Sequence, residues 1–273
     1  MNRTGKVIVV MPAYNAAKTL EACVADIPDG CADEVILVDD ASRDDTVEVA
    51  NRLGLTVFRH AANRGYGGNQ KTCYREALAR GADIVVMVHP DHQYDPRIIP
   101  RLVEPLAAGE ADAVFGSRIL GGRTREGGMP RWKYVANLAL TRLENAVLGL
   151  RLTEFHSGFR AYSRRYLETV RFPENSDDFV FDSEIIAQGV IAGLTVCEIP
   201  IATRYFPEAS QIGVWRSIVY GLGIVRMLAR FTLHRLGLRR RDQFEPIPPG
   251  AREAGERGVA GAPDLSGPDR AAT

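Results

Sequence analysis

Residues 86–96 combine an apolar run with a polar loop, and this combination limits the folds open to the chain. The run ends at Pro90 and is typical of a buried central strand. In open α/β sheets, ligands bind beyond the carboxyl ends of the strands, so the loop is a candidate metal and phosphate site. The alternative is a solvated turn that caps a helix starting near Ile98. The loop's potential ligands are His89, Asp91, His92, Gln93 and Asp95.

Apolar runs alternate with helical stretches through the first half of the chain. Strands are predicted at residues 7–11, 34–38, 56–58, 84–88 and 113–117, and helices at residues 16–27, 44–53 and 69–80. This alternation predicts an α/β fold with a mostly parallel sheet covered by helices on both faces. The glycine-rich residues 63–68 predict a flexible loop.

The second half of the chain is less regular. It predicts a basic glycine-rich loop, helices and a last strand, with residues 157–160 at a turn before another strand or helix. The loop covers residues 121–128, the helices residues 132–148 and 182–192, and the strand residues 195–199.

Composition narrows the class of protein. The 273 residues suit one large domain or a domain with appendages, and 34 basic and 34 acidic residues leave no net charge to attract nucleic acid. The four scattered cysteines form no C-x-x-C pair, as expected for reduced thiols in a cytoplasmic protein. No apolar stretch approaches the roughly 20 residues that span a bilayer, and the first apolar run is too short for a signal peptide.

Residues 214–241 are expected to form a basic amphipathic segment that follows a domain at residues 1–213. Two alternatives remain open: the segment lies on an anionic membrane surface, or it packs on its own domain. Residues 242–273 are rich in Pro, Gly and Ala and are expected to be disordered. In the amphipathic segment, Ile224, Leu228 and Phe231 share one helical face, while Arg226, Arg230 and His234 share another.

Polar residues also follow the first two predicted strands. Asp39 and Asp40 end the second strand, where a carboxylate suits hydrogen bonds to a nucleoside; the alternative is that Asp40 caps the next turn. Pro12, Tyr14 and Asn15 stand after the first strand in place of G-x-G-x-x-G, which argues against a dehydrogenase.

Several motifs occur together in a fixed order along residues 7–212. In that order the chain resembles the family-2 glycosyltransferases of GT-A fold, and most closely the polyprenol-phosphate sugar transferases of the dolichyl-phosphate mannose synthase group. The motifs are VVMPAYNAAKTL, LVDDASRDDT, NRGYGGNQK, HPDHQYDP, SGFRAYSRR, FDSEI and IPIATRYFPEASQI.

The resemblance implies an inverting, metal-dependent hexosyltransferase at the cytoplasmic face of the membrane. It implies a GDP- or UDP-hexose donor carrying mannose or glucose, Mg²⁺ or Mn²⁺, and a polyprenyl phosphate acceptor. Asp91 and Gln93 would hold the metal, Arg118 and Arg131 the acceptor phosphate, and Ser157 would lie beside the reaction centre. The donor-binding residues implied are Pro12, Tyr14, Asn15, Asp39, Asp40, Asn63, Lys71, Arg204, Ser210 and Gln211.

General chemistry agrees with these roles. A diphosphate leaving group needs a Lewis acid, and an ionised phosphate acceptor needs guanidinium groups more than a general base. Arg118 follows a strand end and Arg131 follows the glycine-rich loop; the alternative for either is a surface salt bridge.

His89 departs from the family pattern, which has an acid two residues before Asp91. His89 either joins the metal ligands, or it stays outside the metal shell and there orients Asp91 or contacts the donor phosphate. His92 and Tyr94 are expected to shape the loop, and Glu184 either orients that loop or is an acid on a helix surface.

Two other functions compete with this interpretation. One is transfer to a soluble or glycan acceptor, and the other is a catalytically silent module that binds a nucleotide sugar.

Overall fold

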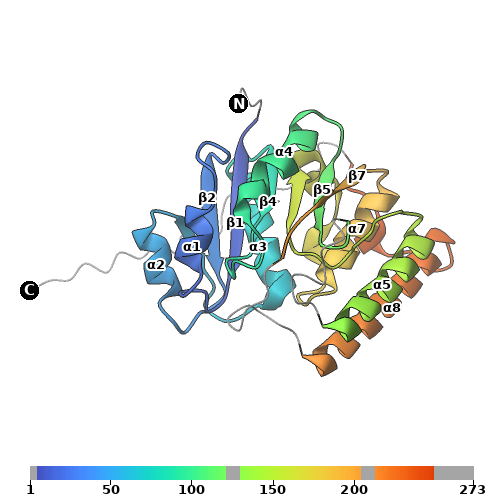
Figure 1. Ribbon diagram of the computed structural model, residues 1–273. Coiled ribbons are helices and arrows are strands. Elements are labelled where there is room, and N and C mark those ends of the chain that lie inside the picture. The colour runs from blue at the N-terminus through green and yellow to red at the C-terminus, as the bar shows by residue number, and fades with distance from the viewer. Residues whose placement is uncertain (1–4, 121–129, 204–212, 249–273) are drawn as a thin grey trace, which may run out of the picture.

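A seven-stranded sheet runs through the centre of the computed structural model, which describes residues 5–120, 130–203 and 213–248 (Figure 1). The strand order is β3-β2-β1-β4-β6-β5-β7, and only β6 is antiparallel to its neighbours. The mostly parallel sheet predicted from the sequence is confirmed. The strands are β1 (Val7–Ala13), β2 (Glu34–Asp39), β3 (Thr56–Arg59), β4 (Ile84–Met87), β5 (Ala113–Ser117), β6 (Arg160–Ser163) and β7 (Val196–Pro200).

The register places three polar loops at one edge of the sheet. Val9 of β1 pairs with Val35 of β2 on one side and with Val86 of β4 on the other, all in parallel. Because parallel strands end at the same edge, the loops that follow β1, β2 and β4 lie together there.

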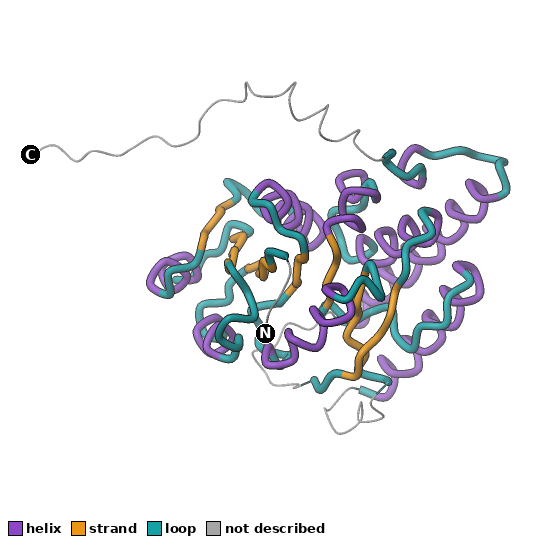
Figure 2. Tube along the Cα trace, turned by 90° about the horizontal axis from the view of Figure 1, so that it is seen from above, coloured by secondary structure: helices purple, strands orange, loops and turns teal. Residues whose placement is uncertain are grey.

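Helices cover both faces of the sheet, as Figure 2 shows from above. Alternate residues of β1 enter opposite cores: Val7 and Val9 face one helical layer, and Ile8 and Val10 the other. The first layer contains α1 (Leu20–Ala25), α2 (Thr46–Arg52) and α4 (Ile99–Ala107). The second contains α3 (Gly65–Ala79), α5 (Arg131–Leu148), α6 (Arg164–Thr169), α7 (Phe181–Ile191) and α8 (Val214–Arg235).

The glycine-rich stretch expected to be a flexible loop is partly helical. Gly65 begins α3, and the Gly67 amide donates a 2.8 Å hydrogen bond to the Asp177 carbonyl. A Cβ on Gly67 would lie 2.3 Å from the Ser176 carbonyl oxygen. Glycine is therefore required because the first turn of α3 packs directly on the backbone ahead of α7, a contact that local sequence does not reveal.

The structure decides between the two alternatives for the apolar face of α8. Ile224, Leu228 and Phe231 are buried in the core beside α5 and α7, so this face packs on its own domain. Arg230 lies 3.3 Å from Glu184 in an ion pair, and the His234 ring contacts Phe244.

The chain remains ordered for several residues beyond the end of α8. The short helix η3 (Asp242–Phe244) buries Phe244 against Phe231, so the disorder expected from residue 242 does not apply to residues 242–248. Residues 249–273 lie outside the described residues. In the described part of the chain, no helix has the length and apolarity needed to cross a bilayer.

Candidate active site

The loop after β4 presents a half-buried carboxylate. The Asp91 carboxylate accepts a 3.1 Å hydrogen bond from the Gln93 amide. Burial raises the pKa of Asp91, and the neighbouring His89 opposes that rise. Asp91 forms no ion pair with any described residue, so a bound cation would supply the charge that this carboxylate lacks.

The residues present fit a metal that is shared with a substrate. Within the described ranges, no group of three or more histidine, cysteine or carboxylate side chains could hold an ion. Mg²⁺ typically uses one or two carboxylates together with substrate phosphates and water. The Asp91 carboxylate together with the side-chain amide oxygen of Gln93 matches that pattern. Two such ligands are too few for a metal site built only from protein side chains.

His89 is packed against protein on one side. Its ring stacks on Tyr66 with centroids 5.5 Å apart, and its Nε2 lies 3.4 Å from the Tyr66 hydroxyl. A Cβ on Gly158 would lie 2.6 Å from the same Nε2. Burial lowers the pKa of His89, so the imidazole is neutral at pH 7. These contacts favour the role outside the metal shell.

A chain of polar contacts continues from His89 across three elements. The Tyr66 hydroxyl donates a 2.9 Å hydrogen bond to Asp182 of α7, and Asp182 lies 3.6 Å from buried Arg160 of β6. Arg160 in turn donates a 2.7 Å bond to the Ser157 carbonyl. Asp182 of the FDSEI motif and Arg160 of the SGFR motif are therefore connected to the loop after β4 through Tyr66 and His89.

Glu184 has neither of the roles expected for it. It is buried, and its carboxylate accepts a 2.6 Å hydrogen bond from the Ser176 amide and pairs with Arg230. Since these partners lie before α7 and on α8, Glu184 fixes the helical layer and does not contact the Asp91 loop.

His92 and Tyr94 shape the loop as expected. His92 adopts a left-handed backbone conformation with φ 56°, and its Nε2 lies 2.9 Å from Asp26 at the end of α1. The Tyr94 ring stacks on Phe159 at 5.6 Å.

Asp39 and Asp40 are both buried at the end of β2. The Asp40 carboxylate accepts hydrogen bonds from the Arg64 and Gly65 amides at 2.8 and 3.1 Å, and His60 Nδ1 lies 2.7 Å from it. Asp40 therefore caps the start of α3 and not, as the alternative interpretation held, the turn directly after β2. Asp39 accepts bonds from the Ser42 amide at 3.1 and 3.3 Å.

The loops after β1 and β2 are joined at Asn15. Its backbone amide donates a 2.8 Å bond to Ser42 Oγ, and its side chain accepts a 2.9 Å bond from the Arg43 amide. Asn15 has φ 54°, and the neighbouring Tyr14 ring is half exposed. Pro12 lies within β1, so the implied donor residues Pro12, Tyr14 and Asn15 stand at the end of this strand.

The other implied donor residues divide into two groups. Asn63 donates a 3.2 Å bond to the Asp40 carbonyl, and Lys71 donates a 2.7 Å bond to Asp177. Both side chains therefore hold α3 in place. Arg204, Ser210 and Gln211 lie outside the described residues.

A buried ion pair follows β5, which runs in the same direction as β4 and so ends at the same edge of the sheet. Arg118 donates hydrogen bonds to Glu154 from its backbone amide at 2.7 Å and from Nε at 2.8 Å. Asn137 of α5 donates a further 2.8 Å bond to the same carboxylate. Burial alone would raise the pKa of Glu154, but the Arg118 charge outweighs it and the pKa lies below its ordinary value. The buried Glu154 carboxylate thus fixes the position of the Arg118 guanidinium.

Two more basic residues lie in the first turn of α5. Arg131 is the first residue of α5 and is exposed, and no described carboxylate pairs with it. Burial and the charge of Arg118 lower the pKa of Lys133, which places its ammonium group within electrostatic reach of Arg118. Sequence reasoning missed Glu154 and Lys133, because neither belongs to a motif whose spacing signals a site.

Tyr94 connects the Asp91 loop to the Arg118 pair. Burial raises its pKa, while the charges of Arg118 and Asp91 act on it in opposite directions and Ser157 hydrogen-bonds to it. Three of the expected site residues therefore act on one phenol group, although they come from separate loops.

A second buried cluster lies behind Ser157. His156 Nδ1 is 2.9 Å from the Tyr220 hydroxyl, and Ser183 donates a 2.6 Å bond to Glu144 of α5. Burial raises the pKa of Glu144 to about 8 and lowers the pKa of His156 to about 3. Both groups are neutral at pH 7, so their 3.3 Å contact is not an ion pair.

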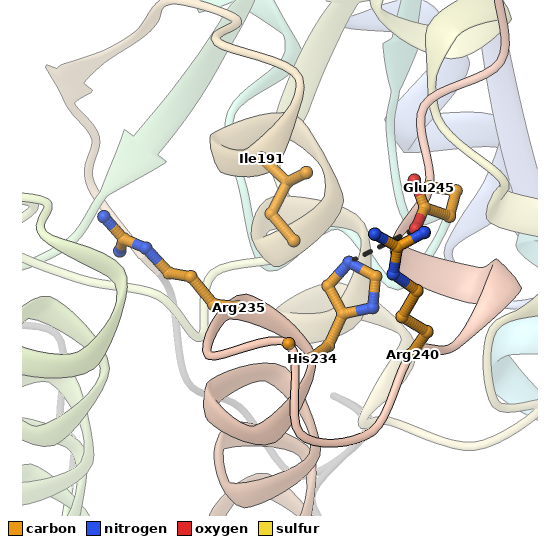
Figure 3. A pocket seen from close by; sticks show the side chains of 6 residues that line it. Ile191, His234, Arg235, Arg240 and Glu245 are labelled. Atoms are coloured by element: carbon orange, nitrogen blue, oxygen red, sulfur yellow. Dashed lines mark ion pairs between the residues drawn. The ribbon is translucent and has the colours of Figure 1, made fainter.

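The pocket drawn in Figure 3 lies elsewhere, at the end of α8. It includes no residue of the Asp91 or Arg118 loops. Its only drawn ion pair joins His234 and Glu245 at 3.9 Å. Its lining residues are Ile191, His234, Arg235, Gly237, Arg240 and Glu245.

The mostly parallel sheet, with helices on both faces and polar loops at one edge, is an α/β fold of the GT-A type. The sequence profile described as "Glycosyl transferase family 2" matches residues 8–171, and the chain belongs to this family.

Two relatives and one solved structure illustrate the likeness. A UDP-N-acetylglucosamine–dolichyl-phosphate N-acetylglucosaminyltransferase from Methanococcus voltae is 28% identical over 81% of this chain and 96% of its own. A dolichyl-phosphate hexose transferase from Haloferax volcanii is 30% identical over 77% of this chain and 91% of its own. Glucosyl-3-phosphoglycerate synthase from Mycobacterium tuberculosis, solved with Mn²⁺, UDP and glucosyl-3-phosphoglycerate, superposes with TM-score 0.61 at 23% identity, covering 86% of this chain and 81% of that one.

Proposed function

We propose that this glycosyltransferase moves a hexose, mannose or glucose, from a GDP- or UDP-sugar to a polyprenyl phosphate at the cytoplasmic face of the membrane. The observation that carries the proposal is Arg118, whose guanidinium is fixed by buried Glu154; a second exposed arginine, Arg131, stands at the start of α5. The two relatives named for transfer to dolichyl phosphate support the choice of acceptor.

The donor diphosphate is assigned to the Asp91 loop. Asp91 and Gln93 would hold Mg²⁺ or Mn²⁺, which neutralises the charge that develops on the leaving diphosphate. His89 keeps its place on Tyr66 and Gly158 and thereby positions the loop. Asp39 and the joined loops at Asn15 would contact the nucleoside.

The acceptor phosphate is assigned to Arg118 and Arg131. A phosphate monoester is largely ionised near neutral pH, since its second pKa is about 6, and it needs orientation more than deprotonation. Glu154 holds the Arg118 guanidinium in one geometry, so less conformational freedom is lost when phosphate binds. A phosphate oxygen then attacks the sugar C1 as the bond to the diphosphate breaks, and the configuration inverts.

A panel assay tests this function. The purified protein is incubated with labelled GDP-mannose, GDP-glucose, UDP-glucose and UDP-N-acetylglucosamine, each with a short polyprenyl phosphate in detergent or with phosphoglycerate. Label that enters the organic phase with a hexose donor supports the proposal. Label transferred only to phosphoglycerate supports a soluble acceptor, and no transfer with any donor supports a silent nucleotide-sugar-binding module.

A further inference from the structure

Helix α5 has its polar face turned inward. Asn137, Thr141 and Glu144, spaced four and three residues apart, are buried and hydrogen-bonded within the domain. The outward face is apolar instead, with Trp132 and Val135 42% and 64% exposed. A helix on the surface of a water-soluble domain normally shows the opposite arrangement, so the outward face requires an apolar partner.

Helix α8 is apolar on two sides. Its inward side is the buried face that contains Ile224, Leu228 and Phe231. Its outward side repeats at the same helical spacing, and its members Trp215 and Leu222 are 74% and 65% exposed. Figure 1 shows α5 and α8 side by side at one end of the sheet, and Gly221 of α8 packs on Leu140 of α5. The outward faces of the two helices therefore belong to one surface.

The charges on this surface have one sign. Helix α8 contains no acidic residue, and Glu144, the single acid of α5, is buried. Figure 3 shows Arg235 at the C-terminal end of α8, with Arg240 and the acid Glu245 just beyond it. The exposed ionisable residues of the two helices are Arg131, Arg142, Arg216, Arg226 and Arg235.

We propose that the outward faces of α5 and α8 dock on the surface of an anionic lipid bilayer. The docking surface comprises Trp132, Val135, Trp215, Ile218, Leu222 and Val225. Apolar side chains enter the region between headgroups and acyl chains, tryptophans favour that depth, and arginines pair with anionic headgroups. A second copy of this chain fits less well, since it would place the same arginines against each other.

Docking would also serve the proposed transfer, on which this part of the inference rests. Arg131 precedes Trp132 at the start of α5, so a tryptophan held at headgroup depth brings Arg131 to the level of lipid phosphates. The acceptor phosphate then reaches the site while its polyprenyl chain stays in the bilayer.

The chain contains its own probe of docking. Its only two tryptophans, Trp132 and Trp215, both lie on the docking surface. Full-length protein is titrated with vesicles of phosphatidylcholine and phosphatidylglycerol that contain no polyprenyl phosphate and no nucleotide sugar. The emission is expected to shift to shorter wavelength, to be quenched by brominated lipid, and to reverse at high salt.

Surface variants test which residues are responsible. Leu222→Ser is expected to weaken vesicle partitioning about tenfold or more, because leucine burial is lost. Arg226→Gln is expected to weaken it about fivefold, whereas Arg75→Gln, an exposed arginine on α3, leaves it unchanged. All three residues are exposed, so thermal unfolding should be nearly unaffected and serves as the control for folding.

Four results would overturn the inference. They are unchanged tryptophan emission, equal partitioning of Leu222→Ser and wild type, equal binding to pure phosphatidylcholine and to anionic vesicles, and a lipid-independent dimer that Leu222→Ser disrupts. The transfer assay in detergent needs no bilayer, so failure of docking and failure of the proposed function give separate results.

Discussion

The imidazole of His89 and the phenol ring of Tyr66 lie face to face, with an interplanar angle of 14° and 3.4 Å between Nε2 and the hydroxyl oxygen. Tyr66 belongs to α3 and His89 follows β4, so this contact joins the glycine-rich start of a helix to the Asp91 loop. His89 thus makes its contacts with protein on the α3 side of the Asp91 loop.

Metal preference distinguishes the two roles of His89. If His89 positions the loop from outside the metal shell, His89→Asp retains transfer and the ratio of Mn²⁺- to Mg²⁺-supported rates stays at the wild-type value. The measurement is the initial rate of lipid-linked sugar formation with each metal at saturation. A marked shift of the ratio toward Mg²⁺ would show instead that the imidazole ligates the ion, because imidazole suits transition metals better.

Glu154→Gln tests whether the buried acid positions Arg118. The substitution keeps the shape but leaves a partly buried guanidinium without its counter-charge, so the free energy of unfolding should fall by about 2–4 kcal/mol. The KM for the phosphate acceptor should rise about tenfold while calorimetric affinity for the nucleotide sugar stays nearly constant. A stability loss without any change in the acceptor KM would leave Glu154 with a purely structural role.

Much of the sheet could be predicted from the sequence, because each central strand is an unbroken apolar run followed by turn residues. The predicted strand at residues 113–117 coincides with β5, and the run at 34–38 differs from β2 by one residue. The antiparallel insertion of β6 between β4 and β5 was not predictable, since Arg160–Ser163 has no distinctive pattern and its place depends on distant strands.

The candidate site was predictable only where residues stand at strand ends. Asp91 and Arg118 could be identified in that way, but Glu154 could not, because its partner Arg118 lies 36 residues earlier in the chain. For α8 the helical period revealed an apolar face but not its direction. Both sides of the helix are apolar, and only the packing with α5 and α7 decides which one is buried.

Glu144 should make stability depend on pH. Its pKa is raised from 4.5 to about 8 in the folded protein, so between these values the unfolded chain ionises while the folded chain keeps the proton. The free energy of unfolding should therefore fall as pH rises from 5 to 8, by about 2–4 kcal/mol. Glu144→Gln should remove this decline, measured by urea unfolding across the pH range.

The matched control is Glu104→Gln, an exposed acid on α4, which should follow the wild-type curve. A Glu144→Gln protein that loses stability in parallel with wild type would contradict the buried neutral carboxyl. His156 acts at the other end of the range. Its pKa is lowered to about 3, so stability should also fall as pH drops below 6.5.

Arg131→Ala should affect the acceptor and spare the donor. A hydrogen bond to a charged group is worth about 1.5–3 kcal/mol, so kcat/KM for the polyprenyl phosphate should fall about ten- to hundredfold. Arg101→Ala, an exposed arginine on α4, is the control and should retain wild-type kinetics. A comparable loss of nucleotide-sugar affinity in calorimetry would assign Arg131 to the donor side.

The most direct test of the account compares wild type with Asp91→Asn in lipid-linked hexose formation, with added Mg²⁺ or Mn²⁺ and after exhaustive chelation. Asparagine keeps the shape of the side chain and removes the charge that a divalent cation requires. The account predicts that the wild-type protein loses transfer on chelation and regains it with metal, and that Asp91→Asn forms almost no product under any condition although it remains folded. Full activity of Asp91→Asn, or wild-type transfer that persists after chelation, would contradict it.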